Sequence, residues 1–370
     1  DTRYNADDAD DCLAWSDSQQ DPEATSYLGK GPWLRWMVGE DGLGFQPIRI
    51  GASTTPPFFA PPGVQYGAFA IPTGPFATDP ASDESPIYVF YTQPTNGDPA
   101  QVGPNILARS DDGTKTFHFV YYFPFPDFYN VSSVVVDTGV IPGLPSSTGK
   151  GLLVFGTGTY RQSNVYLAFC SVDDLEALDQ NEATGEAGTL PSDQWFFFLG
   201  LAADGAPIWS AQNVDAPAPL FEEPFNGEPG IGEFSVAFEP QTGLWLMLYQ
   251  FQTGNVEARY APNPWGPWDA PGLPEVIFDP FDPSYYVFGQ GGFLHNKGGP
   301  DTLNQIPGAC PSACGVWCSD DEGAVYGPYM VPSWFKVNPG SLTIYYTLST
   351  WRPYQVVLMK SEFKITCASS

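Results

Sequence analysis

The sequence predicts an all-β fold, a β-propeller built from four-stranded antiparallel sheets, and three observations lead to this prediction. Pairs of apolar runs separated by a short polar turn recur along the 370 residues. Their spacing of roughly 60 to 100 residues suits one four-stranded sheet for each repeat. The 39 glycines and 39 prolines suit many turns between short strands, and the chain shows no long run with helical periodicity.

The clearest pair of runs lies near the C-terminus. Two runs rich in β-branched and aromatic residues, 342–348 and 355–361, flank the turn 349–354, which is the pattern of a β-hairpin. Further copies are predicted upstream at 244–261, 152–171 and 87–110. A fifth copy at 46–53 is a weaker prediction, since Pro47 cannot donate a ladder hydrogen bond.

Other apolar runs complete a sheet around each hairpin. The predicted first, innermost strands are 64–71, 131–136, 233–238 and 327–331, and the predicted last strands are 116–123, 195–199 and 276–278. A strand from 33–50 is expected to complete the final sheet, which would remove an exposed edge. The predicted helix is 171–179, with Ser171 as N-cap and acidic residues in its first turn, whereas 201–229 is predicted as a loop.

The chain is expected to form one propeller domain. Residues 1–26 are polar and acidic and are predicted to be a solvated N-terminal arm, and 27–370 are predicted to form the single β-propeller domain. This domain includes a cysteine-rich loop near 308–320. The long repeat, which spans nearly the whole chain, is the reason to prefer one closed domain over two.

Cysteine usage points to an oxidising compartment. The six cysteines suit three disulfides, and a bond between Cys12 and Cys367 fits a sheet closed by both termini. Cys310, Cys314 and Cys318 lack a fourth ligand at the spacing of a zinc site, so we expect a disulfide-pinned loop, no metal and no cofactor. We therefore expect a secreted, extracellular protein.

The charge of the chain limits its partners. With 42 acidic and 14 basic residues, the net charge is −28. Nucleic acid is excluded as a partner because phosphate binding needs clustered lysine and arginine. No apolar run approaches the length of a membrane span, so membrane insertion is not expected. A polysaccharide or other glycan is the expected partner, and the oligomeric state stays open.

The direction of the strands predicts where a site lies. In an antiparallel sheet the chain reverses at each turn, so a first strand begins at the same mouth as the turn between the second and third strands. The candidates that converge there are Glu233 as catalytic residue and, for substrate binding, Asn130, Arg161, His295, Trp351, Arg352 and Tyr354. Carboxylate, guanidinium, amide and aromatic groups together suit a sugar ring.

Four of these candidates also have a structural interpretation. Arg161 and Arg352 either bind a ligand or pair with acidic residues between sheets, and Glu233 is either the acid catalyst or the partner of an arginine. Trp351 is either a packing residue or a stacking platform. Asp137 is a weaker catalytic candidate, because six residues of strand would place it at the opposite mouth.

Four motifs lie in or beside the predicted hairpins. They are Gly-Thr-Gly-Thr-Tyr-Arg-Gln-Ser-Asn-Val-Tyr-Leu-Ala (156–168), Gly-Glu-Phe-Ser-Val (232–236), Ala-Pro-Asn-Pro-Trp-Gly-Pro-Trp (261–268) and Tyr-Thr-Leu-Ser-Thr-Trp-Arg-Pro-Tyr-Gln-Val-Val-Leu-Met (346–359). Together they resemble a family of secreted five-bladed β-propellers, long a domain of unknown function, that includes endo-D-arabinanases. The resemblance covers residues 64–365 and implies five blades and a glycoside hydrolase fold.

One stretch departs from this family. In its arabinanases a catalytic aspartate lies in a Gly-Asp-Thr-Phe stretch that closes an apolar strand, whereas the corresponding residues 89–93 here, Val-Phe-Tyr-Thr-Gln, contain no acid. No catalytic aspartate is therefore assigned by resemblance. Three functions remain: an endo-D-arabinanase-like glycoside hydrolase, a non-catalytic glycan-binding or structural extracellular propeller, and a polysaccharide lyase whose base would be a residue such as His295.

Overall fold

The computed structural model describes residues 12–13, 46–47, 71–79, 82, 85–92, 105–111, 117–123, 125–158, 161–179, 194–211, 217–279, 325–350 and 355–365. These residues form antiparallel sheets together with the short helix α2 (Val172–Asp179), which confirms the predicted all-β class. The chain divides into two compact units. The C-terminal unit comprises Arg161–Val165, Leu220–Ser370 and Asp1–Asp7, and the N-terminal unit comprises Asp8–Tyr160 and Tyr166–Pro219.

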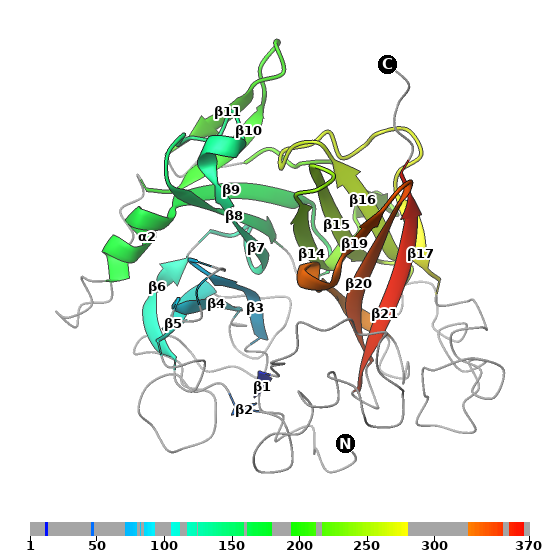
Figure 1. The fold of residues 1–370 in the computed structure, drawn as a ribbon, viewed down its shortest axis with the longest axis horizontal. Helices are drawn as coiled ribbons and strands as arrows, with labels where there is room; N and C mark the ends of the chain where they lie inside the picture. The colour runs from blue at the N-terminus through cyan, green and yellow to red at the C-terminus, as the bar shows by residue number, and fades with distance from the viewer. Residues whose placement is uncertain are drawn as a thin grey trace. The chain divides into compact units, whose positions relative to one another are not determined.

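The N-terminal unit contains two larger sheets (Figure 1). The first has the order β3 (Ile71–Ala77), β4 (Ile87–Thr92), β5 (Asn105–Ser110), β6 (His118–Phe123). The second runs from β7 (Asn130–Asp137) through β8 (Lys150–Thr157), β9 (Val165–Ser171) and β10 (Phe196–Leu201) to β11 (Pro207–Ser210). Two short strands, β1 (Cys12–Leu13) and β2 (Gln46–Pro47), pair with each other.

The first strands of these two sheets lie directly against each other. Gly74 in β3 has φ 52°, and a Cβ on it would come within 2.9 Å of Ser133 Oγ and of a Val131 methyl group, both on β7. Only glycine fits this backbone conformation and this close approach without strain. The packing of β3 on β7 therefore depends on Gly74.

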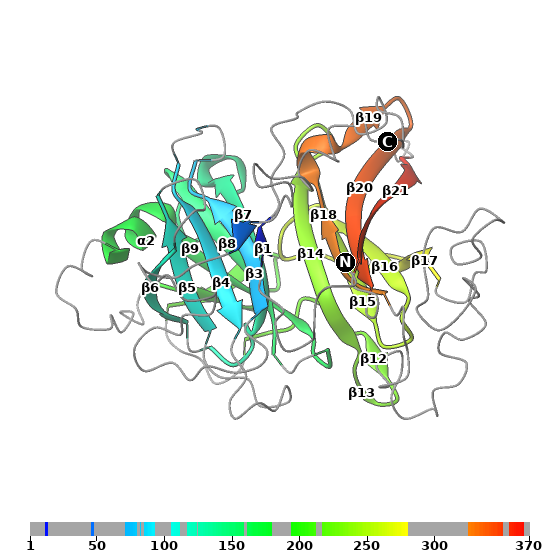
Figure 2. The same cartoon turned by 90° about the horizontal axis from the view of Figure 1, so that it is seen from below.

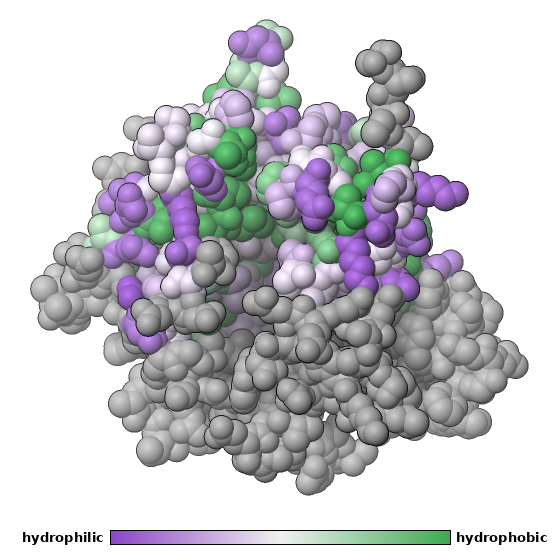
Figure 3. Space-filling view, viewed as in Figure 1, coloured by the Kyte–Doolittle hydropathy of each residue, from purple (hydrophilic) through white to green (hydrophobic). Residues whose placement is uncertain are grey.

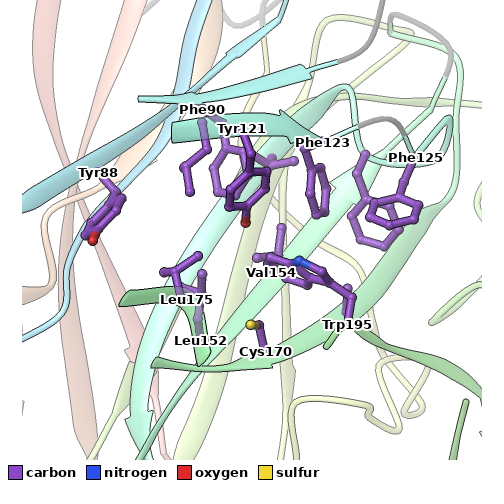
Figure 4. Packing of buried hydrophobic residues seen from close by; sticks show 14 of the residues in the cluster. Tyr88, Phe90, Tyr121, Phe123, Phe125, Leu152, Val154, Cys170, Leu175 and Trp195 are labelled. Carbon is purple, nitrogen blue, oxygen red and sulfur yellow. The ribbon is translucent and has the colours of Figure 1, made fainter. Parts of the chain in front are cut away.

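Aromatic side chains from both sheets form the core of the N-terminal unit (Figure 4). Phe123 of β6 packs edge-on against Phe125 and Trp195, with ring centroids 4.8 Å apart in each case. Edge-to-face contacts of this kind add to the gain from burying the rings. Leu175 of α2 is fully buried in the same cluster, so the helix packs on the sheets through an apolar face.

The C-terminal unit holds two larger sheets and one small hairpin. The hairpin is β12 (Pro224–Phe225) with β13 (Glu228–Pro229). The third large sheet has the order β14 (Ile231–Glu239), β15 (Leu244–Phe251), β16 (Val256–Ala261), β17 (Glu275–Phe278). In the fourth, β20 (Ser341–Thr350) pairs on one edge with β18 (Val325–Met330) and β19 (Lys336–Asn338) and on the other with β21 (Gln355–Lys364).

The two large sheets of this unit share an apolar core, and their first strands, β14 and β18, contact each other. Figure 2 shows β14 next to β18. Apolar residues of β15 and β16, such as Leu248 and Ala258, share one cluster with Ile344 and Leu348 of β20. The start of β14 and the strand β18 thus come together inside one unit.

Several predicted elements are confirmed. The hairpins at 152–171, 244–261 and 342–361 are β8–β9, β15–β16 and β20–β21, and the helix at 171–179 is α2. Residues 64–70 of the predicted first strand 64–71 lie outside the described residues, and the described strand that pairs with β4 is Ile71–Ala77. The segment 201–229 is not a plain loop, because it contains β11, β12 and β13.

Other predictions fall outside the described residues or are changed. Of the strand expected from 33–50 to complete the final sheet, the described residues are Gln46–Pro47, and these pair with Cys12–Leu13. The cysteine-rich loop near 308–320 lies outside the described residues. Among the described residues, the thiol of Cys170 is free and buried, and the disulfides expected elsewhere stay predictions. The closed ring, the count of five blades and the single domain 27–370 stay predictions.

The outer hairpin of the N-terminal unit is exposed. At the top of Figure 3 the hairpin β10–β11 carries both hydrophilic and hydrophobic residues, and Leu201 and Ile208 are 48% and 43% exposed. Trp209 on the same hairpin donates a hydrogen bond of 2.9 Å from its indole nitrogen to the carbonyl oxygen of Gly143. In the described part of the chain, no helix is long and apolar enough to cross a membrane.

Candidate functional site

The start of β14 is shaped by two glycines. A Cβ on Gly230 would lie 2.4 Å from the ring of Phe251, and one on Gly232 would lie 3.1 Å from the carbonyl oxygen of Gln250. The pairing of β14 with β15 is irregular at this point, between Ile231 and Phe234. The absence of side chains therefore lets the entry to β14 lie close against the end of β15. Glu233 follows directly and is 7% exposed.

The turn after β8 is brought to the same place. Arg161 has φ 57°, a left-handed conformation that is costly for a residue other than glycine. Gln252 donates a hydrogen bond from its side-chain amide to the carbonyl oxygen of Arg161. Ser163 and Ile231 form a β-bridge through hydrogen bonds in both directions. These contacts fix the turn against the start of β14 and hold Arg161 in its unusual conformation.

Arg161 and Glu233 form a largely buried ion pair. Arg161 Nε lies 2.7 Å and Nη2 lies 2.5 Å from Glu233 Oε1. The arginine and glutamate side chains are 16% and 10% exposed. A buried charge is costly to leave without its partner, so each of these side chains stabilises the other in this position.

Two tyrosines of β18 complete the cluster. The guanidinium carbon of Arg161 lies 5.5 Å from the centroid of the Tyr326 ring, within the range of a cation–π interaction. Burial raises the pKa of Tyr329, the negative charge of Glu233 raises it further, and the positive charge of Arg161 opposes the shift. The phenol of Tyr329 therefore remains protonated and can donate a hydrogen bond at neutral pH.

The structure brings together some of the residues predicted from the sequence. Arg161 and Glu233 meet in the C-terminal unit, as strand direction predicted. Gln252 lies beside them. Glu233 is the partner of an arginine, which is the structural interpretation given for it above. Binding or catalytic roles for Arg161 and Glu233 stay predictions.

Asn130 and Asp137 lie at opposite ends of β7 in the N-terminal unit. Asn130 is the first residue of the strand, and within the described residues its buried Oδ1 has no hydrogen-bond partner. Asp137 ends the strand, and its Oδ1 accepts a hydrogen bond of 2.9 Å from the backbone N–H of Gly139. The placement of Asp137 away from the start of the strand agrees with its low rank as a candidate. His295, Trp351, Arg352 and Tyr354 lie outside the described residues.

Neither Tyr326 nor Tyr329 was among the predicted site residues, although Tyr329 lies in the predicted first strand 327–331. The pairing of β18 with β20 shifts register between these two tyrosines, around Gly327 and Pro328. A glycine–proline pair inside an apolar strand is a signal for such an irregularity, and irregularities of this kind often redirect side chains near sites.

A second polar cluster in the same unit is buried more deeply. Arg259, 4% exposed, donates to Tyr249 Oη at 3.0 Å and to the carbonyl oxygen of Trp268 at 2.8 Å, and it pairs with Glu223. Tyr249 donates to Glu257 Oε2 at 2.9 Å. Burial raises the pKa of Glu257, the Tyr249 hydrogen bond lowers it, Glu223 raises it, and Arg259 lowers it. These groups satisfy one another, which fits a structural network.

Metal ligands do not gather in the described residues. Within them, no group of three or more histidine, cysteine, aspartate or glutamate side chains is arranged to hold a metal ion. The described site is therefore built from an ion pair, an amide and phenols.

Fold and site define the chain as an all-β protein of repeated antiparallel sheets with a polar cluster where a first strand begins. Residues 105–360 match the model of the family described as "Domain of unknown function (DUF4185)". The chain belongs to this family. Among curated proteins there is no significant match to the chain.

The similarities to solved structures are weaker than the match to the family model. A protein of Bacteroides ovatus has 13% identity and a TM-score of 0.41, with 77% of this chain and 55% of that chain covered. A β-fructofuranosidase of Schwanniomyces occidentalis has 10% identity and a TM-score of 0.38, with 80% and 44% covered. An α-L-arabinanase of Penicillium chrysogenum has 12% identity and a TM-score of 0.29, with 78% and 93% covered.

The extent of these similarities is limited. The chain spans about half the length of the first two proteins, at 55% and 44% of those chains. At these identities and TM-scores, none of the three assigns a reaction or a substrate to this chain.

Proposed function

We propose that this chain is a secreted, carbohydrate-active β-propeller of five blades that binds a polysaccharide at the start of β14 and hydrolyses it in the manner of an endo-D-arabinanase. The observation that carries the proposal is the Arg161–Glu233 pair, which is largely buried and lies against the aromatic ring of Tyr326. Carboxylate, guanidinium and aromatic groups in one place suit the hydroxyls and the apolar face of a sugar.

The described sheets support the propeller part of the proposal. In each unit two sheets of four or more strands follow each other along the chain, and their first strands contact each other, β3 with β7 and β14 with β18. Adjacent blades of a propeller have this arrangement, with the first strand of each blade facing the axis.

Glycoside hydrolysis sets a condition on the site. Two carboxyl groups must flank the cleaved bond, about 5–5.5 Å apart for retention of configuration or about 6.5–9.5 Å apart for inversion. Glu233 is proposed as one of them. The reaction also requires a second acid on the other side of the cleaved bond.

Glycan binding without hydrolysis is the second candidate function. It is favoured by the ion pair, since two nitrogens of Arg161 contact the same oxygen of Glu233. An arginine that holds the carboxylate in a fixed position favours a binding role, in which the carboxylate accepts a hydrogen bond from a sugar hydroxyl. The same residues would then act as a lectin-like site.

One experiment separates these functions. The purified chain is incubated with D-arabinan, with L-arabinan and with oligogalacturonate, and binding is measured by calorimetry while products are separated by chromatography. New reducing ends that disappear in Glu233→Gln, but persist in the control Glu275→Gln on the exposed end of β17, support the hydrolase. Binding without products over a long incubation supports the second candidate.

The remaining outcomes reject the proposal. Products with ultraviolet absorbance from a new double bond identify a lyase. No binding and no products with any of the glycans would exclude this site as one for these carbohydrates. Because each outcome differs in its readout, the three function classes are distinguished in one series.

A further inference from the structure

The strand β18 contains one residue more than its partner between its two tyrosines. Tyr326 lies opposite Ser349 and Tyr329 lies opposite Thr347, so three steps on β18 match two steps on β20. Side chains three residues apart in a regular strand point to opposite faces of the sheet. An extra residue removes this alternation and directs both tyrosines to one face.

Two features hold this bulge in place. Gly327 has φ 62°, a conformation in which glycine carries little strain. Ser235 of β14 donates a hydrogen bond of 2.7 Å from its hydroxyl to the carbonyl oxygen of Pro328 and accepts one of 3.1 Å from the backbone N–H of Met330. The bulge is thereby attached to β14 two residues after Glu233.

The two tyrosines meet the ion pair in different ways. The ring of Tyr326 lies under the guanidinium of Arg161, at 5.5 Å from its carbon to the ring centroid. Tyr329 lies close enough to Glu233, Tyr326 and Arg161 for all three to act electrostatically on its phenol. Tyr326 therefore offers its aromatic face to the arginine, and the phenol of Tyr329 lies within electrostatic range of the same ion pair.

We propose that the bulge of β18 makes Tyr329 a ligand-contacting residue, which donates its phenolic hydrogen to an acceptor oxygen of a neutral sugar, and makes Tyr326 the residue that positions Arg161. This inference rests on the proposed function and names the class of its substrate. The sugar would present a hydroxyl to Glu233 beside a ring or glycosidic oxygen that accepts from Tyr329.

The charges of the cluster favour a neutral sugar. The ionised side chains of Arg161 and Glu233 carry +1 and −1, and a protonated Tyr329 adds no charge, so these groups give no net attraction for an ionised sugar. The net charge of −28 on the whole chain repels polyanions in addition. An uronate or a sulfated glycan is therefore disfavoured relative to a neutral glycan such as arabinan.

The test relies on what each tyrosine must supply, which is the hydroxyl group at Tyr329 and the aromatic ring at Tyr326. Binding of D-arabino-oligosaccharides to the full chain is measured by calorimetry for Tyr326→Phe, Tyr326→Leu and Tyr329→Phe. The control is Tyr260→Phe, a tyrosine of β16 that is 42% exposed. We expect Tyr329→Phe to weaken binding about 10-fold, because a hydrogen bond is lost.

Tyr326 is expected to behave in the opposite way. Tyr326→Phe keeps the ring and should bind as the wild type does, whereas Tyr326→Leu removes the ring beneath Arg161 and should lose about 5-fold or more. A merely structural pair of aromatic residues would tolerate phenylalanine at both positions. Full affinity in Tyr329→Phe, or equal losses in Tyr326→Phe and Tyr326→Leu, would therefore overturn the inference while leaving the proposed function intact.

The two proposals can fail separately. If the wild type binds none of the neutral oligosaccharides, the proposed function and the ligand role of Tyr329 fall together. The positioning role of Tyr326 is then judged without a ligand, by the coupling of Tyr326→Leu and Arg161→Met in thermal unfolding. Additive losses of stability in that double mutant would show that Tyr326 does not hold the arginine.

Discussion

Gln252 donates a hydrogen bond from its side-chain amide to the carbonyl oxygen of Arg161, 91 residues earlier in the chain. This contact joins the turn after β15 to the turn after β8. Because Arg161 has φ 57°, its conformation depends on partners that hold it in place. The amide of Gln252 is thus a support for the arginine and not only a surface polar group.

The first prediction concerns this support. We expect Gln252→Ala to lower the free energy of unfolding by about 1 kcal/mol, the typical contribution of one hydrogen bond. It should also weaken glycan binding, since Arg161 would be held less firmly. Gln241→Ala, at an exposed position before β15, is the matched control and should change neither quantity. Urea denaturation and calorimetry measure the two effects, and an unchanged stability in Gln252→Ala would contradict this role.

The second prediction isolates the contact between Gly327 and Tyr329. A Cβ on Gly327 would lie 3.0 Å from Cε2 of Tyr329, whereas one on Gly340 would meet nothing within 4 Å, and both glycines have positive φ, 62° and 82°. Replacing either with alanine should cost about 1–2 kcal/mol of stability through backbone strain. Only Gly327→Ala should displace the tyrosine and so reduce glycan affinity.

Binding and unfolding measurements on this pair of variants test the second prediction. Equal affinities in Gly327→Ala and Gly340→Ala, at similar stability, would show that the position of Tyr329 does not matter for the ligand. A loss confined to Gly327→Ala would attribute the effect to the bulge, since the strain is common to both.

The third prediction is a pH dependence of stability from Glu257. Burial raises the pKa of its carboxyl above the ordinary value, so the folded protein binds the proton more tightly than the unfolded chain. The stabilisation from this proton is fully present below the unfolded pKa and is lost as pH rises through the higher, folded pKa. At neutral pH the ionised carboxylate is therefore a net cost at this position.

Glu257→Gln removes this cost. The amide oxygen can still accept the hydrogen bond that Tyr249 donates to Glu257 Oε2. We expect Glu257→Gln to melt at a higher temperature than the wild type at pH 7 and the difference to shrink at pH 4. The exposed Glu275→Gln on the neighbouring strand should show no such trend. If Glu257→Gln gained less stability over the wild type at pH 7 than at pH 4, the direction assigned to the pKa shift of Glu257 would be wrong.

Much of the fold was predictable because hairpin patterns are local. The runs 342–348 and 355–361 became β20 and β21 since β-branched and aromatic residues fill both strands. The strand Ile71–Ala77 was missed because Pro72, Gly74 and Pro75 usually mark turns. Tertiary packing makes this segment a strand, because the absence of a side chain at Gly74 lets β3 approach β7.

The site was predictable only in part. Strand direction sufficed to place Arg161 near Glu233, since it depends on the order of elements and not on their side chains. The pairing of the two charges depends on the left-handed turn at Arg161, which the sequence does not show. Site roles for Tyr326 and Tyr329 were not predicted, because the bulge breaks the two-residue period from which the face of a strand residue is assigned.

The fourth prediction measures the Arg161–Glu233 pair itself. Because the two side chains are 16% and 10% exposed, Arg161→Met should leave a largely buried carboxylate without its cation and cost about 3–5 kcal/mol of stability. Glu233→Gln should cost less, as the amide oxygen can still accept from the guanidinium. The double variant should lose less than the sum of the single losses, because the two side chains interact directly.

An exposed ion pair provides the control for this cycle. Lys150 and Asp79 lie 2.5 Å apart, with side chains 41% and 50% exposed. Lys150→Met should therefore cost at most about 1 kcal/mol. Glycan affinity of the same variants then separates a structural from a functional pair. If Arg161→Met and Glu233→Gln both lose stability but the better-folded Glu233→Gln binds glycan at full strength, the pair is a structural support and the site at the start of β14 must be abandoned.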